Sequence, residues 1–401
     1  MAANYAFSFT TEDGGFGTCG DNTETLIHTI QGAGLTSPVA GSIRIIEGVV
    51  TADYQNSPIE MGGFFIQEEE ADADANPATS EGIYVFESAQ AVAVGDVVRL
   101  QGTVVEFTSG AITFTEISPV ATLTICSSGN SLPAAAAISL PAASVNDLEA
   151  YEGMRVTLAQ TLYVTEHFTL GRFGEVLLSA NDIQYQFTHG NLPSVAGYAA
   201  FQNDFARSTI TLDDANAQQN KDPIVHPAPG LTALNTLRIG DTVAGLTGIL
   251  DHRFDLYRIQ PTGVVPFTAS NPRPAAPDNV GGTIWVGSFN VLNYFSTLDL
   301  GPDICGPLAN QECRGADSAI EFTRQRNKII QAIIALNADV IGLMEIENHV
   351  TDAALDDLIS GLNAVAGAGT YAKISQFPLG DDAIKVALIY RPAWVTPVNP
   401  P

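Results

Sequence analysis

The feature that most constrains the fold is a pair of similar segments far apart in the chain. Gly95–Val104 reads GDVVRLQGTV, and Gly240–Ile249 reads GDTVAGLTGI. Each begins with a Gly-Asp turn, continues as a strand and carries a later glycine, which suits a barrel strand that bends sharply. The similarity extends to Glu116–Pro119 and Arg258–Pro261. We interpret the two regions as copies of one β module, with chance similarity of common turn patterns as the alternative.

Short β-rich runs surround both segments, and glycine, asparagine, aspartate and proline separate one run from the next. Runs of this kind are typical of small all-β barrels or sandwiches. The predicted strands are 43–51, 63–67, 82–87, 97–107 and 112–117 in the first region, and 154–158, 161–166, 175–179, 242–250 and 256–260 in the second. We therefore predict a leader segment at 1–37, followed by two tandem OB-like β modules at 38–130 and 138–269.

A different pattern follows a proline-rich stretch. Residues 271–277 read NPRPAAP, a composition typical of semi-rigid connectors, and we predict a linker at 270–282. Beyond it, strand patterns at 283–291, 340–344 and 384–390 alternate with amphipathic helix patterns at 321–336 and 353–363. This alternation predicts that residues 283–401 form part of an α/β domain, in a chain that is multidomain.

The charge of the chain is strongly acidic and unevenly distributed. The 401 residues carry 44 acidic and 17 basic side chains, and residues 1–269 hold 30 of the acids and 9 of the bases. Such a charge repels polyanions at long range, which argues against non-specific nucleic-acid binding. No apolar run approaches the roughly 20 residues that span a bilayer, so we expect no membrane segment. Residues 1–5 lack the features of a secretory signal, and we expect the signal to be removed or to precede this sequence.

Four cysteines form an even, sparse set without CxxC spacing, which favours disulfides over a metal cluster. Cys305 and Cys313 are close enough in sequence to close a small loop, and Cys19 and Cys126 remain as a candidate second pair. Four buried thiols are the alternative. The acidic, lysine-poor composition with an even number of cysteines is typical of a secreted protein.

The residues that carry chemistry stand at two strand ends. Asn290 ends a predicted strand and Glu345 follows the next one, with a predicted helix between them. If the strands neighbour each other in one sheet, both side chains emerge at the same edge, where open α/β sheets place their sites. A carboxylate supplies charged oxygen to Mg²⁺ or Ca²⁺, and an amide orients that carboxylate or a phosphate oxygen. Because carboxylates at strand ends are common without function, the spacing alone leaves both interpretations open.

An ordered series of motifs surrounds these two residues. It runs through 284–295 (IWVGSFNVLNYF), 305–307 (CGP), 313–317 (CRGAD), 321–326 (EFTRQR), 338–348 (ADVIGLMEIEN) and 380–390 (GDDAIKVALIY), with 62–67 (GGFFIQ), 78–82 (ATSEG) and 152–154 (EGM) upstream. In this order, the motifs resemble the extracellular nuclease branch of the endonuclease/exonuclease/phosphatase superfamily, the ExeM-like and NucH-like enzymes. The resemblance extends over nearly the whole chain.

The resemblance implies a partial four-layer α/β sandwich in a secreted, metal-dependent nuclease. By this resemblance Asn290 is the active-site asparagine near the scissile phosphate, and Glu345 is the principal acidic ligand of the catalytic cation. That cation is expected to be Mg²⁺ or Mn²⁺, with Ca²⁺ as a further candidate. The substrate is expected to be DNA, or alternatively RNA, and we predict no protein partner. The family also implies a Cys305–Cys313 disulfide.

The sequence departs from the family after these motifs. The family's later Gly-Asp-x-Asn strand end, its His or Arg strand and its terminal Asp and His do not follow. These groups supply the base and orient the attacking water in the family's mechanism, so we expect an incomplete catalytic domain without appreciable nuclease activity. None of the six histidines matches them, and we interpret His349 as a loop cap. The alternatives are a non-catalytic extracellular protein that binds DNA or glycans, and a phosphomonoesterase of the same superfamily.

Three weaker patterns have ordinary structural interpretations. Residues 72–76 begin like a calcium loop, but Pro77 replaces the required glycine, so a solvated acidic loop is favoured. Residues 212–214 are interpreted as a turn with two solvated carboxylates. A group of cations belongs either to a phosphate contact or to a solvated helix face: Arg314, Arg324, Arg326 and Lys328.

Overall fold

The computed structural model describes residues 15–232 and 234–398. The chain divides into two compact units, one of Met1–Leu231 with Leu237–Pro272 and one of Arg273–Pro401 with Thr232–Thr236. The division at Pro272 falls inside the predicted linker. Residues 1–14 of the predicted leader and residues 399–401 of the predicted α/β region lie outside the described residues.

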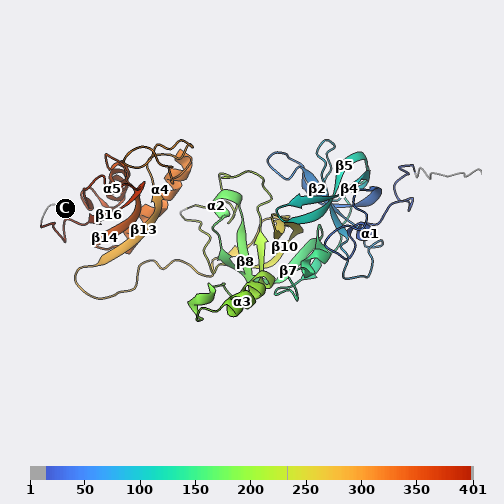
Figure 1. Ribbon diagram of the computed structural model, residues 1–401, viewed down its shortest axis with the longest axis horizontal. Helices are drawn as coiled ribbons and strands as arrows, with labels where there is room; N and C mark the ends of the chain where they lie inside the picture. The colour runs from blue at the N-terminus through green and yellow to red at the C-terminus, as the bar shows by residue number, and fades with distance from the viewer. Residues whose placement is uncertain (1–14, 233, 399–401) are drawn as a thin grey trace, which may run out of the picture. The chain divides into compact units, whose positions relative to one another are not determined.

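The first unit begins with a closed five-stranded barrel, drawn in blue and teal in Figure 1. Its strands are β1 (Ile43–Tyr54), β2 (Gly63–Gln67), β3 (Gly82–Val85), β4 (Val97–Ser109) and β5 (Ile112–Ser127), in the ring order β1-β2-β3-β5-β4. β3 and β5 are parallel and the other neighbours are antiparallel. A short helix, α1 (Ile27–Gln31), adds Ile27 and Ile30 to the barrel core.

A second ring with the same strand order follows. Its strands are β7 (Arg155–Glu166), β8 (Val176–Ala180), β9 (Thr209–Leu212), β10 (Thr242–Arg253) and β11 (Leu256–Pro261). They pair as β7-β8-β9-β11-β10, and a β10–β7 ladder closes the ring. β9 and β11 are parallel, as β3 and β5 are. β6 (Ala136–Ile138) and β12 (Phe267–Thr268) extend the sheet. This order and these directions are those of a five-stranded Greek-key barrel of the OB type.

The two similar segments occupy the same place in the two rings. The Gly95 and Gly240 residues adopt φ of +88° and +89°, in the left-handed region that favours glycine. The Asp96 and Asp241 carboxylates then each accept a backbone N–H three residues upstream at 2.8 Å. The turns therefore lead into β4 and β10 by the same contacts, which agrees with the interpretation of two copies of one module.

The second module differs from its predicted form in several respects, and its strands β6, β9 and β12 were not predicted. The predicted strands 154–158 and 161–166 are one continuous strand, β7. Helix α3 (Val195–Ser208) was not predicted, although Tyr198, Phe201 and Phe205 recur at helical spacing, and none of its side chains is buried. The prediction of two solvated carboxylates at 212–214 is wrong, because Asp213 is buried and binds the Arg258 guanidinium at 2.7 Å. Short helical turns complete this module: η1 (Asp147–Tyr151), α2 (Leu170–Phe173) and η2 (Phe187–His189).

The two barrels share a buried junction. Ile249 of β10 packs into an aromatic cluster of the first barrel that includes Tyr84 and Phe114. The Arg253 guanidinium lies 4.3 Å and 4.4 Å from the centres of those two rings, within the range of cation–π attraction. Backbone contact is also close, since a Cβ added to Gly82 would lie 2.3 Å from the Gly153 carbonyl carbon.

The second unit contains a mixed sheet in the order β13-β14-β16-β15. Its elements are β13 (Val286–Tyr294), α4 (Ala319–Leu336), β14 (Val340–Glu347), α5 (Ala353–Ala366), β15 (Ala372–Ile374) and β16 (Ile384–Tyr390). β13 and β14 are parallel, and β16 runs antiparallel to β14. The two helices contribute to one core with the strands (Figure 1), whereas Val286, Val386 and Leu388 are exposed. The short strand β15 was not predicted.

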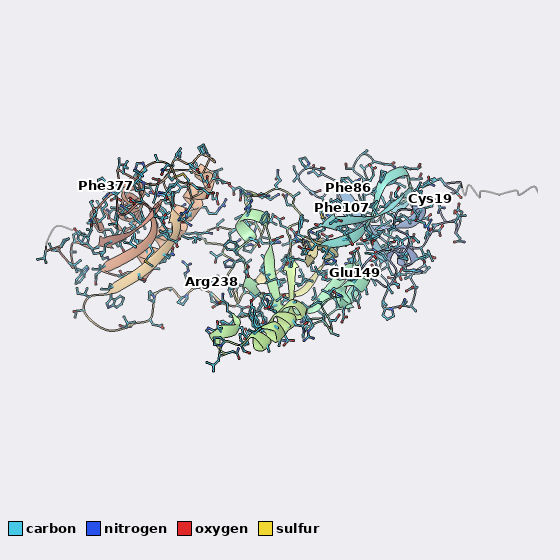
Figure 2. The ribbon with its side chains drawn as sticks, in the orientation of Figure 1. Cys19, Phe86, Phe107, Glu149, Arg238 and Phe377 are labelled. Carbon is cyan, nitrogen blue, oxygen red and sulfur yellow. A yellow bond between two sulfur atoms is a disulfide. The ribbon has the colours of Figure 1, made fainter. Side chains whose placement is uncertain are left out.

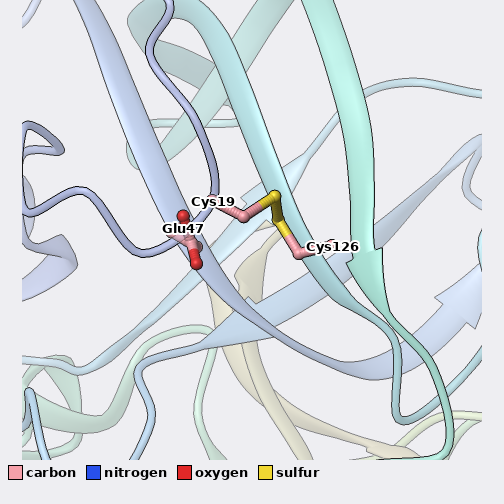
Figure 3. A group of neighbouring side chains, drawn as sticks. All are labelled: Cys19, Glu47 and Cys126. Carbon is pink, nitrogen blue, oxygen red and sulfur yellow. A yellow bond between two sulfur atoms is a disulfide. The ribbon is translucent and has the colours of Figure 1, made fainter.

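Both cysteine pairs form disulfides, as predicted. Cys305–Cys313 closes a loop between β13 and α4, and Cys19–Cys126 ties the segment before α1 to the end of β5 (Figure 3). The disulfides are compatible with an oxidising, extracellular environment. Among the described residues, no helix combines the length and the apolar character needed to cross a bilayer.

The close approach at the barrel junction gives a stability test. Replacing Gly82→Ala places a methyl group against the Gly153 backbone, and we expect the free energy of unfolding to fall by about 1–3 kcal/mol. The matched control is Gly263→Ala, since a Cβ at Gly263 meets nothing within 4 Å. Urea unfolding of both variants measures the difference, and equal stability of the two would contradict the junction.

Candidate functional site

The structure brings the predicted pair Asn290 and Glu345 together. Asn290 pairs with Met344 in the parallel β13–β14 ladder, and Glu345 is the next residue along β14. The Asn290 Nδ2 donates a hydrogen bond of 2.8 Å to the Glu345 Oε1. The adjacency follows from the topology, because a helix connects two parallel neighbours and brings both strand ends to one edge.

The backbone is distorted at this point in both strands. Glu345 has a φ of +64°, and Leu292 and Asn293 have φ values of +51° and +54°. Residues other than glycine pay about 1–3 kcal/mol for such a conformation, which tends to persist at functional sites. Two hydrogen bonds hold it, from the Leu292 N–H to the Asn290 Oδ1 at 2.7 Å and from the Asn293 N–H to the Glu345 Oε2 at 3.2 Å.

The chemistry of this pair suits a hard cation. Asn290 is exposed and Glu345 is half-buried, so the carboxylate can be reached from solvent. Its two hydrogen-bond partners are an amide and a backbone N–H, which are neutral and leave its charge uncompensated. Mg²⁺ is commonly bound by one or two carboxylates while it keeps several waters. The residues present therefore fit a water-rich Mg²⁺ or Mn²⁺ site, with Glu345 as its charged ligand.

Other acidic side chains near this edge already have structural partners. The Glu347 Oε2 accepts the Ser296 N–H at 2.8 Å and the Ser296 hydroxyl at 2.9 Å. Asp352 is fully buried and binds Lys385 and Lys373 at 2.5 Å and 2.9 Å. These carboxylates hold loops in place, so Glu345 is the better candidate for a cation.

Arg326, in the middle of helix α4, also has a structural partner. The Arg326 Nε binds the Asp357 Oδ2 of α5 at 2.7 Å, and the Tyr294 hydroxyl donates to the same oxygen at 2.5 Å. Burial, and then the Asp357 carboxylate, raise the pKa of Tyr294, so the phenol stays protonated. Arg326 is thus committed to a helix–helix contact and does not meet a phosphate here.

Two other residues that the sequence analysis singled out, His349 and Arg314, make local contacts. The His349 Nδ1 accepts the Thr351 N–H at 3.1 Å, which is the loop-cap role predicted for it. Arg314 is exposed and lies 3.4 Å from Asp382. Burial, followed by the charge of Arg324, lowers the pKa of Lys328.

Groups of potential metal ligands that were not predicted lie in the barrels. One comprises Cys19, Glu47 and Cys126, but its sulfurs form a disulfide and cannot act as thiolate ligands (Figure 3). Another comprises Glu149, Glu152 and His252. Glu149 and Glu152 lie close together in sequence, but His252 is far from both, so no local spacing motif marks the group.

Comparison with known proteins covers part of the chain. Residues 134–270 match the family described as Domain of unknown function (DUF8508), and this segment contains β6 to β12 of the second barrel. No curated protein and no solved structure matches the chain.

The candidate cation site can be tested by paramagnetic broadening. We expect Mn²⁺ to broaden the backbone amide signals of Leu292, Asn293 and Glu345 first, because these groups surround the carboxylate. Glu345→Gln removes the charged ligand and is expected to weaken this effect about 10-fold or more. Asp381→Asn, which changes an exposed carboxylate of the same unit, is the control and should leave the broadening unchanged. Equal broadening in wild type and Glu345→Gln would exclude Glu345 as the ligand.

Proposed function

We propose that the protein is an extracellular, divalent-metal-dependent nuclease that hydrolyses phosphodiester bonds of DNA or RNA. The observation that carries the proposal is the Asn290–Glu345 hydrogen bond across two parallel strand ends, at backbone positions held in the left-handed region. The motif series around these residues, which resembles extracellular nucleases, supports the same reaction class. The cation is Mg²⁺ or Mn²⁺, with Ca²⁺ as the alternative.

The two residues have separate roles in this proposal. Glu345 binds the cation, and the bound cation supplies neutralisation of the charge that develops on the phosphate and on the leaving oxygen. Asn290 fixes the Glu345 carboxylate through one N–H of its amide. An asparagine amide has two N–H donors, so the second remains available for a phosphate oxygen. Asn290 thereby positions both the ligand and the substrate.

The charge distribution assigns the polyanion to the second unit. Residues 270–401 hold 14 acids and 8 bases, whereas residues 1–269 hold 30 and 9. The α/β region therefore repels a nucleic acid much less than the barrels do. In this proposal the barrels are accessory modules and do not form the main substrate grip.

The proposed architecture of the catalytic region is the four-layer sandwich of the endonuclease/exonuclease/phosphatase type. The described residues supply one sheet with helices on one face, and the opposite face exposes Val286, Val386 and Leu388. A second sheet against that face would bury these side chains, as sheet packing in a sandwich requires. The described residues of the α/β unit offer no arranged candidate for the base or for the water-orienting groups of this reaction.

Binding of glycans is a second candidate function, favoured by exposed aromatic side chains in the second barrel. Tyr185 and His189 stack with ring centroids 4.6 Å apart, and the rings of Tyr198 and Phe201 are also stacked. Tyr185 is 53% exposed and Tyr198 is 48% exposed, which leaves ring faces open to a ligand. The acidic charge of this region favours a neutral ligand over a nucleic acid.

Nicking of supercoiled plasmid with Mg²⁺ or Mn²⁺ tests the nuclease proposal. We expect the 401-residue chain to cut at background rate, because its described residues supply a metal ligand without an arranged base. If the gene continues beyond the codon for Pro401, we expect its whole product to cut DNA, and Glu345→Gln to slow cutting about 100-fold or more.

The same assay includes matched substrates and a control. Asp381→Asn in the longer product should keep full activity. If that product leaves DNA and RNA intact but hydrolyses a phosphomonoester, the result would contradict the nuclease proposal and favour a phosphatase. A gene that ends at Pro401, with retention of the chain on immobilised glycans, would favour the binding function.

A further inference from the structure

Three potential metal ligands converge in the second barrel, where it meets the first. Glu149 lies on η1, Glu152 follows that turn, and His252 lies on β10 (Glu149 is labelled in Figure 2). The His252 Nδ1 is 3.5 Å from the Glu149 Oε2 and 4.0 Å from the Glu152 Oε2. One ligand atom from each residue lies within 4.8 Å of the others. The cluster is in the other unit from Glu345 and is independent of the proposed nuclease site.

Two of the polar atoms in this cluster, the Glu152 Oε2 and the His252 Nδ1, lack hydrogen bonds. The Glu152 side chain is only 5% exposed, and its Oε2 has no hydrogen-bond partner. The His252 Nδ1 is also buried without one, since its approach to Glu149 does not meet hydrogen-bond geometry. Buried polar atoms almost always have a partner, and leaving one without a partner costs about 1–3 kcal/mol. Two such atoms aimed at each other indicate a missing ligand between them.

The local charge indicates that this ligand is a cation. The Glu152 carboxylate is buried, and Glu149 places a second carboxylate close to it. Glu106 of the first barrel is half-buried, and its inaccessible Oε2 lacks a hydrogen-bond partner. Such an accumulation of buried negative charge is costly unless it is paired or coordinates a metal.

We propose that Glu149, Glu152 and His252 bind one divalent transition-metal ion of the Zn²⁺ class. An imidazole ligand favours Zn²⁺ and related metals over Mg²⁺ and Ca²⁺, which take oxygen ligands. Tetrahedral ligands at the roughly 2.0–2.1 Å typical of Zn²⁺ lie about 3.4 Å apart, close to the spacing of His252 and Glu149. Three protein ligands leave a fourth position for water.

Neighbouring groups orient the ligands as outer-shell partners do in metal sites. The Tyr257 hydroxyl donates to the Glu149 Oε2 at 2.8 Å, and the Tyr257 ring stacks on His252 with centroids 3.8 Å apart. The Thr115 N–H of the first barrel donates to the Glu152 Oε1 at 2.9 Å. Glu152 is a proposed metal ligand of the second barrel that also contacts the first barrel. An ion bound by Glu152 therefore stabilises the barrel junction as well as the second barrel.

A cluster of the same composition in the first barrel provides a control. It consists of His28, Glu68 and Glu81, but its facing atoms already have partners. The His28 Nδ1 and the Glu81 Oε2 bind each other at 3.1 Å, and the Glu68 Oε1 accepts the Ile27 N–H. This first-barrel cluster is complete without an ion.

The test is a Zn²⁺ titration of the whole chain after removal of metal with a chelator. We expect one tightly bound equivalent by elemental analysis after dialysis, together with a higher Tm. Glu149→Gln and His252→Gln should each weaken the affinity for this Zn²⁺ ion by more than about 100-fold, since loss of an outer-shell partner alone weakens metal affinity 10- to 100-fold. Glu149 is half-buried, so Glu149→Gln should fold even if His252→Gln does not. His28→Gln should bind Zn²⁺ as wild type does.

The outcomes separate this site from the nuclease site. Glu345→Gln should still bind one Zn²⁺ ion tightly even if Mn²⁺ no longer broadens its amide signals. Either proposal can therefore fail alone. No tight Zn²⁺ binding by the wild-type chain, or equal binding by folded Glu149→Gln, would overturn the metal site. Loss of binding in His28→Gln would equally overturn it, by moving the ion to the first barrel.

Discussion

Ring closure at the Gly-Asp turn is the constraint on which the first unit depends. The left-handed glycine lets the aspartate reach back to the backbone, and the Asp96 and Asp241 carbonyls then accept N–H groups of β1 and β7 at 2.8 Å. These bonds tie the start of the fourth strand to the first strand, which closes the ring and removes its free edges. Closed barrels can then pack side by side, and that packing buries Glu152 against the Thr115 N–H.

Charge pairing separates structural carboxylates from candidate ligands. Arg99 is fully buried among three carboxylates, Arg258 binds two, and Lys385 pairs with a fully buried aspartate. Desolvation of each charge is offset by its partner, and removing one partner would leave a buried charge uncompensated. With 17 basic residues against 44 acids, the chain cannot pair every carboxylate in this way. Glu152 and Glu345 are positioned by neutral donors instead, which is why both are candidates for a metal ion.

The sequence predicts the regular parts of this structure and misses those that depend on tertiary contacts. Period-two strands and the repeated Gly-Asp turn indicate the barrels, and strand–helix alternation predicts β13, α4, β14 and α5. Helix α3 was missed although Tyr198, Phe201 and Phe205 recur at helical spacing, and none of its side chains is buried. The Asn290–Glu345 contact follows from parallel topology, whereas the left-handed φ of Glu345 does not, because its residue type does not favour that conformation. Ring closure alone brings His252 to Glu149, so no local pattern reveals that pair.

The two proposed metal sites call for different chemistry because their surroundings differ. Glu345 is half-buried and offers oxygen ligands only, which suits a weakly held, water-rich cation that exchanges with solvent and meets a substrate. The His252 cluster is buried, includes an imidazole and joins two barrels through Glu152, which suits a tightly held ion with a structural role. A chelator should therefore act on two properties by separate routes. Under the two proposals, rapid loss of an ion from Glu345 would affect turnover, and slow loss of an ion from His252 would affect the stability of the barrel pair.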